Sequence, residues 1–80
     1  MKKLNLYLIY QDVNNDFDTY DSAVVAAESD DDARNIHSSG YDNWGLSVWC
    51  KPDQVKVTLI GNAEDNMKRG VICASFNAGW

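Results

Sequence analysis

The sequence carries one strong helix-start signal, and the segments on both sides of it alternate in the manner of strands. Ser29 is followed by Asp30–Asp32, whose carboxylates meet the positive end of a helix dipole, and the last of them can reach back to complete a capping box. Gly40 predicts the C-terminal stop, which gives a helix of two to three turns. Its predicted inward stripe consists of Ala33, Ile36 and His37.

Four segments are predicted to be strands: Leu4–Gln11, Ser22–Ala27, Val55–Ile60 and Val71–Phe76; the first and the third have the period of two that is typical of strands. In the first, Leu4, Leu6, Leu8 and Tyr10 make one fully apolar face. A loop of about nine residues separates the first two segments, which is too short for a crossover helix, so these strands should be antiparallel. The sequence therefore predicts an α+β fold of order β-β-α-β-β: a small single antiparallel sheet of about four strands with one helix on one face.

The segments between these elements are less regular. A short strand is possible at Leu46–Cys50, Pro52 indicates a turn or a single helical turn, and Asn62–Arg69 could hold one more helical turn. The chain of 80 residues makes a single domain, residues 1–80. A chain of this size buries only about 60% of its unfolded surface. Its nine aromatic residues cannot all fit in such a core, so some should face solvent, a ligand or a partner.

Charge is distributed unevenly along the chain. The net charge of −5 argues against a nucleic-acid binder, because phosphates must be met by Lys and Arg. Residues 12–32 contain eight of the twelve acidic residues and no basic one: Asp12, Asp16, Asp18, Asp21, Glu28, Asp30, Asp31 and Asp32. Such an acidic lobe favours encounter with basic partners, although a solvated face with ordinary helix capping explains it as well.

Metal binding and catalysis find little support in the sequence. Asp12, Asn14, Asp16 and Asp18 occupy the first ligand positions of a calcium loop, but Phe17 replaces its glycine and Ala23 its final glutamate. The single histidine falls on the predicted inward stripe. Cys50 and Cys73 lie in or beside strands, and both are expected to be free thiols, as is usual in a reducing compartment. No glycine-rich phosphate cradle precedes the helix. We therefore expect no metal, no cofactor and no enzymatic activity.

An aromatic segment, residues 41–49, is a second candidate for binding. Tyr41 and Trp44 have the character of an interface hot spot or of a stacking pocket for a base. The alternative is that Trp44 covers the helix and Trp49 fills the open end of the sheet.

Several motifs resemble a family of small phage-encoded proteins. They are the stretch Asp16–Ser29 together with Ala33–His37, Trp49-Cys50 and Ala74–Gly79, which span most of the chain. The resemblance implies the cytoplasm of an infected bacterium as the setting, and it assigns no site residues. By analogy of size, charge and origin it suggests an accessory factor that blocks a host defence system.

The leading hypothesis is a non-enzymatic inhibitor, anti-CRISPR-like, whose acidic surface occupies the basic nucleic-acid site of a host defence protein. Its predicted partner-binding residues are Asp12, Asp16, Asp18, Tyr20, Asp21, Tyr41 and Trp44. The alternative is an oligomeric sponge for a nucleotide immune signal, with phosphates held by Lys51, Lys56, Lys68 and Arg69. A structural or regulatory phage factor is a third possibility.

Other partners are constrained by the same features. We expect no direct nucleic-acid contact and no membrane partner, since the chain has no stretch of about 18 apolar residues and no signal-peptide cleavage site follows Lys2-Lys3. A homodimer is possible by pairing of an exposed sheet edge.

Overall fold

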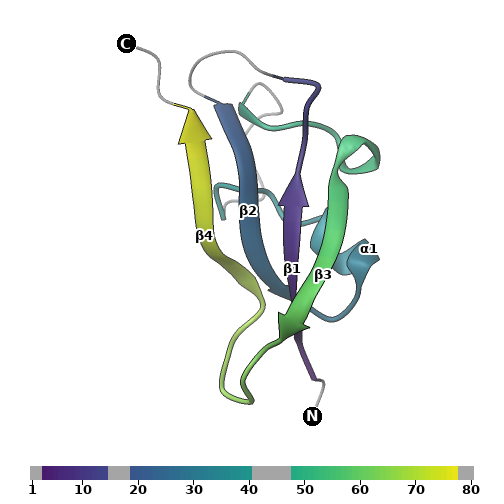
Figure 1. Cartoon of the computed structure of the whole chain (residues 1–80), viewed down its shortest axis with the longest axis vertical. Helices are drawn as coiled ribbons and strands as arrows, with labels where there is room; N and C mark the ends of the chain where they lie inside the picture. The colour runs from purple at the N-terminus through teal and green to yellow at the C-terminus, as the bar shows by residue number, and fades with distance from the viewer. Residues whose placement is uncertain (1–2, 15–18, 41–47, 78–80) are drawn as a thin grey trace.

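The fold is a four-stranded antiparallel sheet with one short helix packed on one face (Figure 1). A computed structural model describes residues 3–14, 19–40 and 48–77 of the chain, and it describes residue 77 by its backbone alone. The strands are β1 (Asn5–Tyr10), β2 (Thr19–Ala27), β3 (Lys56–Asn62) and β4 (Gly70–Asn77), in the spatial order β3-β1-β2-β4. The predicted α+β class and the β-β-α-β-β order are confirmed.

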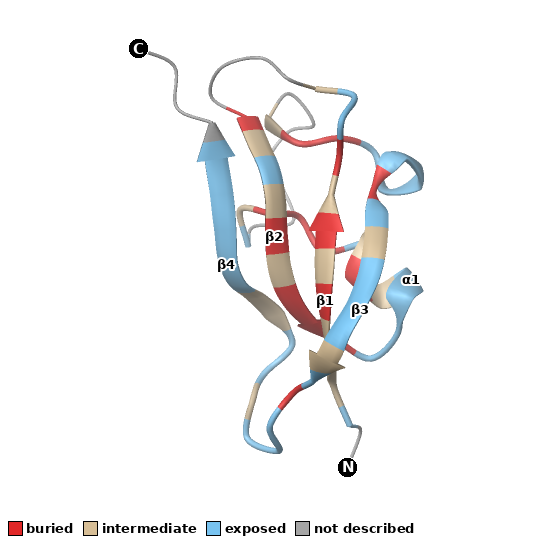
Figure 2. Cartoon of the chain, viewed as in Figure 1, coloured by how far each residue is buried: buried red, intermediate tan, exposed pale blue. Residues whose placement is uncertain are grey.

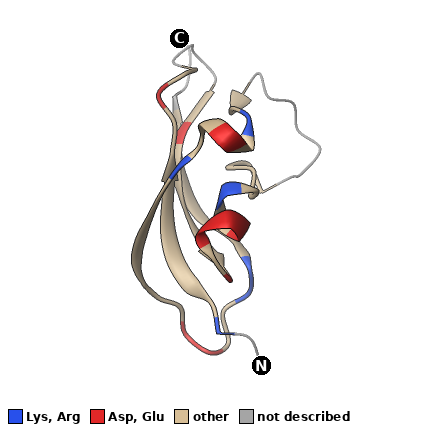
Figure 3. Cartoon of the chain, turned by 90° about the vertical axis from the view of Figure 1, so that its right-hand side faces the viewer, with Lys and Arg blue, Asp and Glu red and all other residues tan. Residues whose placement is uncertain are grey.

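The core lies between the sheet and a layer formed by helix α1 (Asp30–Arg34), the residues that directly follow it, and the residues on both sides of the 3₁₀ turn η2 (Pro52–Gln54). In the side view, α1 and η2 stand on the same side of the sheet (Figure 3). The buried residues concentrate on β1, the second half of β2 and the segment after α1 (Figure 2). The core cluster comprises Tyr7, Ile9, Ala23, Val25, Ala27, Ala33, Ile36, Trp49, Cys50 and Val55.

The buried face of β1 is not its fully apolar face. Tyr7 and Ile9 are 6% and 0% exposed and belong to the core, whereas Leu6, Leu8 and Tyr10 are only half-buried and lie on the opposite face. There, Leu8 contributes with β2 and β4 residues to an open apolar hollow of about 190 Å³. We call this side, which α1 and η2 do not cover, the open face.

Helix α1 is shorter than its sequence predicts. Ser29 is the N-cap, as expected, but the helix ends at Arg34 rather than near Gly40. The backbone amides of Asn35 and Ile36 donate to carbonyls three residues back, at 3.2 and 3.1 Å, so the last turn tightens and does not continue. The predicted stripe is nevertheless buried, because the chain after the helix stays against the sheet: the exposed fractions of Ile36 and His37 are 4% and 7%.

The remaining local predictions have mixed outcomes. Pro52 begins the single 3₁₀ turn η2, as expected. Residues 63–69 form no helix; they contain a turn in which the Met67 amide donates to the Glu64 carbonyl at 2.9 Å. Of the possible strand at Leu46–Cys50, residues 48–50 are not in a strand and the rest lies outside the described residues. Within the described segments, no helix is long and apolar enough to cross a bilayer.

Candidate partner-binding site

The acidic residues of the described chain fall into two groups rather than one lobe. Asp12 and Asp21 lie where β1 ends and β2 begins, while Glu28 and the aspartates of α1 follow the other end of β2. Glu28 lies seven positions after Asp21 along extended backbone, which is roughly 23 Å at the usual rise of a strand. Asp16 and Asp18 lie outside the described residues, between the two members of the first group in sequence.

Gln11 fixes the backbone around the first acidic group. Its side chain is 6% exposed and donates from Nε2 to the carbonyls of Asn14 and Tyr20, at 2.8 and 2.9 Å. Its Oε1 accepts from the amides of Val13 and Asn14, at 2.9 and 2.7 Å. The Gln11 backbone amide also donates to the Asp21 carbonyl at 3.2 Å. One buried amide thereby ties the end of β1 to the start of β2, and it does so without a tight hairpin turn.

Asp21 is exposed at a bulge next to an aromatic pair. Tyr20 pairs with Phe76 and Ser22 pairs with Ser75, so Asp21 is the extra residue on β2. The rings of Tyr20 and Phe76 meet edge to face, with centroids 4.8 Å apart, and Phe76 is 46% exposed. An exposed carboxylate and a partly exposed aromatic pair are thus held by backbone pairing on adjacent strands; we call Tyr20, Asp21 and Phe76 the β2–β4 patch.

Of this patch, sequence reasoning identified Tyr20 and Asp21 and missed Phe76. Phe76 lies in a segment that was correctly predicted as a strand. Its contact with Tyr20 depends on the register between β2 and β4, two strands that are more than 40 residues apart in the chain. No local signal in the sequence reports that register.

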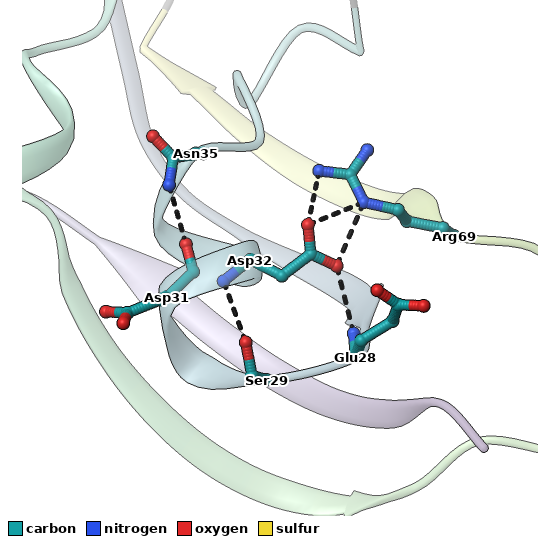
Figure 4. Close-up of polar contacts among 6 residues, drawn as sticks. All are labelled: Glu28, Ser29, Asp31, Asp32, Asn35 and Arg69. Carbon is teal, nitrogen blue, oxygen red and sulfur yellow. Dashed lines mark hydrogen bonds and ion pairs between the residues drawn. The ribbon is translucent and has the colours of Figure 1, made fainter. Parts of the chain in front are cut away.

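Two of the aspartates of α1, Asp31 and Asp32, make contacts within the fold. The Asp32 amide donates to Oγ of the N-cap residue Ser29 at 3.1 Å, and Asp32 Oδ2 accepts from the amide of Glu28, the residue before the N-cap, at 3.0 Å. The same carboxylate accepts two hydrogen bonds from Arg69 Nε, at 2.8 and 2.9 Å (Figure 4). Asp31 makes a longer ion pair with Arg34, at 3.9 Å, and its side chain is 92% exposed.

Asp12 also contacts a cation, since Lys56 Nζ lies 3.2 Å from its Oδ2 on the surface. Lys56 and Arg69 are two of the four cations that a nucleotide sponge would use, and each contacts a carboxylate in this structure. The hollow on the open face is lined by uncharged residues alone among those described: Leu8, Ser22, Ala23, Val24, Cys73, Ala74 and Ser75.

His37 and the two cysteines are the remaining candidates for catalysis or metal binding. The imidazole of His37 is buried, and its Nδ1 accepts a hydrogen bond from the Ser39 amide at 3.1 Å. Cys50 is buried and Cys73 exposed, and the two are not bonded to each other. Burial, with a smaller contribution from the nearby charge of Asp53, raises the pKa of the Cys50 thiol. In the described ranges, no group of three or more His, Cys, Asp or Glu residues is placed to hold a metal ion.

Tyr41 and Trp44, the predicted aromatic hot spot, lie outside the described residues. Trp49 is 2% exposed and belongs to the core cluster, which agrees with its expected packing role.

Comparison of the chain with models of protein families, with curated proteins and with solved structures finds no significant match. The resemblance to phage-encoded proteins therefore stays a prediction.

Proposed function

We propose that this chain is a small phage accessory protein that acts without catalysis, by binding and inhibiting a host defence protein. In this proposal, which is anti-CRISPR-like, its acidic surface occupies a basic nucleic-acid site of that protein. The observation that carries the proposal is the β2–β4 patch, in which the exposed Asp21 adjoins the aromatic pair of Tyr20 and Phe76. The setting in an infected bacterium comes from the sequence resemblance.

The composition of the patch suits recognition of a basic protein surface. Tyrosine and other aromatic residues supply much of the binding energy in small interfaces, because they bury a large area at low entropic cost. A neighbouring carboxylate gives the contact its charge preference, and the net charge of −5 steers the encounter with a cationic partner. The patch is also fixed in place, since β2 and β4 are paired and Gln11 holds the start of β2 to the end of β1.

The size of the chain is sufficient for such an interface. A stable complex buries about 800 Å² on each partner. The whole chain exposes 5276 Å², so one such interface would cover about 15% of its surface. Asp12 and the undescribed Asp16 and Asp18 are neighbours of the patch in sequence and would extend its negative charge.

The test begins with expression of the tagged chain in a bacterial host and native mass spectrometry of the gently purified material. A host protein at fixed stoichiometry is the expected result. Its affinity is then measured for the wild type, for Asp21→Lys and for Asp30→Lys. The last makes the same charge change at an exposed position on α1. Asp21→Lys should weaken binding by about tenfold or more, since it places a cation against a cationic site.

Two results would contradict the proposal. One is the absence of any co-purifying protein from hosts that carry defence systems. The other is an equal loss of affinity in both variants, which would assign the effect to net charge rather than to the patch. Phe76→Ala should also weaken binding. The thermal melting of this variant must be followed in parallel, because Phe76 packs on Tyr20 within the fold.

A further inference from the structure

The outer edge of β4 carries no charge along its whole length. The strand reads Gly-Val-Ile-Cys-Ala-Ser-Phe-Asn, without Lys, Arg, Asp, Glu, His or Pro. It stands at the end of the sheet, so one of its sides has no strand partner among the described residues (Figure 1). Residues 72–76 are exposed, and Ile72 and Phe76 are each 46% accessible (Figure 2).

The other edge of the sheet is protected in several ways. Helix α1 packs beside β3, and the Arg34 guanidinium donates to the carbonyl of Val55, directly before that strand, at 3.1 Å. Lys56 begins β3 and carries a charge that discourages pairing with another strand. Of the described helices and strands, only β2 packs extensively against β4.

Each edge strand has one bulged residue, Ile60 in β3 and Ile72 in β4. A bulge twists a strand and weakens pairing at its own position. In β4 it leaves Cys73–Asn77 as an uninterrupted run of extended backbone. Unpaired N–H and C=O groups along such a run are a template for an added strand.

We infer that two copies of this chain associate by antiparallel pairing of β4 with β4 of the second copy. A two-fold axis makes the interface self-complementary, and the sheet becomes continuous across eight strands in the order β3-β1-β2-β4-β4-β2-β1-β3. A second copy suits this edge because two chains of net charge −5 meet there through a strand that has no charge to repel its equivalent. The pairing uses backbone groups of β4 and leaves Asp21 on β2 accessible.

The area involved predicts a weak dimer. The five residues Cys73–Asn77 span roughly 17 Å, and a strip about 10 Å thick along that edge covers roughly 170 Å² per copy. This is well below the roughly 800 Å² per partner of a stable complex. Association should therefore depend on concentration, from monomer near about 1 μM to dimer towards about 1 mM.

The first test is sedimentation of the full chain across that range, with a thiol reductant present so that the exposed Cys73 cannot cross-link two copies. The mass should rise from 9.0 kDa towards twice that value. Amide exchange followed by NMR should show added protection in Cys73–Asn77 at the higher concentrations. Stacking of two open faces would add no such protection on β4.

Ser75→Lys places a charge at the middle of the proposed pairing run, and Thr58→Lys is its matched control on the β3 edge; both residues are exposed. The first should raise the dimer dissociation constant by about tenfold or more, and the second should change it by less than about twofold. A mass that stays at 9.0 kDa throughout, growth into open filaments, or equal effects of the two variants would each overturn the inference. None of these measurements requires a host protein, so their failure is separable from failure of the proposed function.

Discussion

Arg69 Nη2 lies 2.7 Å from Asp32 Oδ1, so the residue directly before β4 is joined to the helix that follows β2. The Asp32 side chain is 21% exposed and that of Arg69 46% exposed. The same carboxylate accepts a hydrogen bond from the Glu28 amide, so it contacts both the backbone before α1 and the guanidinium. Strand β4, an edge of the sheet, thus has a side-chain link to the layer that covers the core.

Loss of this carboxylate should destabilise the fold by more than loss of its partner. Asp32→Ala removes both the hydrogen bond from the Glu28 amide and the charge-assisted pair with Arg69, at an expected cost of about 1–2 kcal/mol, whereas Arg69→Ala removes only the half-exposed pair, at about 0.5 kcal/mol. Urea denaturation followed by circular dichroism measures both. Asp31→Ala is the control, because its side chain is 92% exposed. If Asp31→Ala cost as much as Asp32→Ala, the stabilising role of the Asp32 carboxylate would be refuted.

A second prediction concerns the two faces of β1. Ile9→Ala should lower the free energy of unfolding by about 2–5 kcal/mol, because Ile9 is fully buried and its loss leaves a cavity. Leu8→Ala should cost about 1 kcal/mol, since Leu8 is only half-buried at the edge of an open hollow. Both values come from denaturation at low protein concentration. Similar costs for the two variants would contradict the assignment of the core to one face.

The two cysteines should differ in reactivity. Cys73 is exposed and should react rapidly with a thiol reagent near pH 8. The Cys50 thiol is buried and its pKa is raised, so little thiolate is present and modification should await opening of the structure. Mass spectrometry of the partially labelled chain identifies the modified residue. Denaturant should abolish the difference, and equal rates in the native state would contradict the burial of Cys50.

The same thiol makes stability depend on pH. In the unfolded chain Cys50 ionises near its ordinary value of 9.0, while in the folded chain its pKa is higher. The unfolded state therefore releases a proton first, and stability falls as the pH rises above that ordinary value. Cys50→Ala should reduce this slope when unfolding is measured between about pH 8 and 10. A slope that is unchanged in the variant would assign the effect to other groups.

The predictable parts of the fold were those encoded by neighbouring residues. The Ser29 cap and the strand character of β1 to β4 follow from short patterns, and both are present in the structure. The predicted length of α1 was wrong, because Gly40 marks a possible stop but does not reveal that the backbone hydrogen bonds tighten and the helix ends after Arg34.

Features that depend on residues far apart in the sequence could not be predicted from short patterns. The fully apolar face of β1 would be expected to form the core, yet the opposite face, with Tyr7 and Ile9, does so. Which face is covered depends on where residues such as Ile36, Trp49 and Val55 pack, and no periodicity reports it. The same limit applies to the contact between Tyr20 and Phe76, which exists only once β4 has been placed beside β2.

The strand order has a consequence for the sequence of events in folding. β1 and β2 are consecutive and form the centre of the sheet, so their pairing closes a short loop and can come early. Among the described strands β4 comes last in the chain, and until it is added the outer side of β2 has no partner among them. During that interval the nascent chain presents an apolar strand, rich in alanine and valine, to whatever else is nearby. The period before β4 docks is thus the time at which this protein is most exposed to misassembly, and rapid docking of β4 is what ends it.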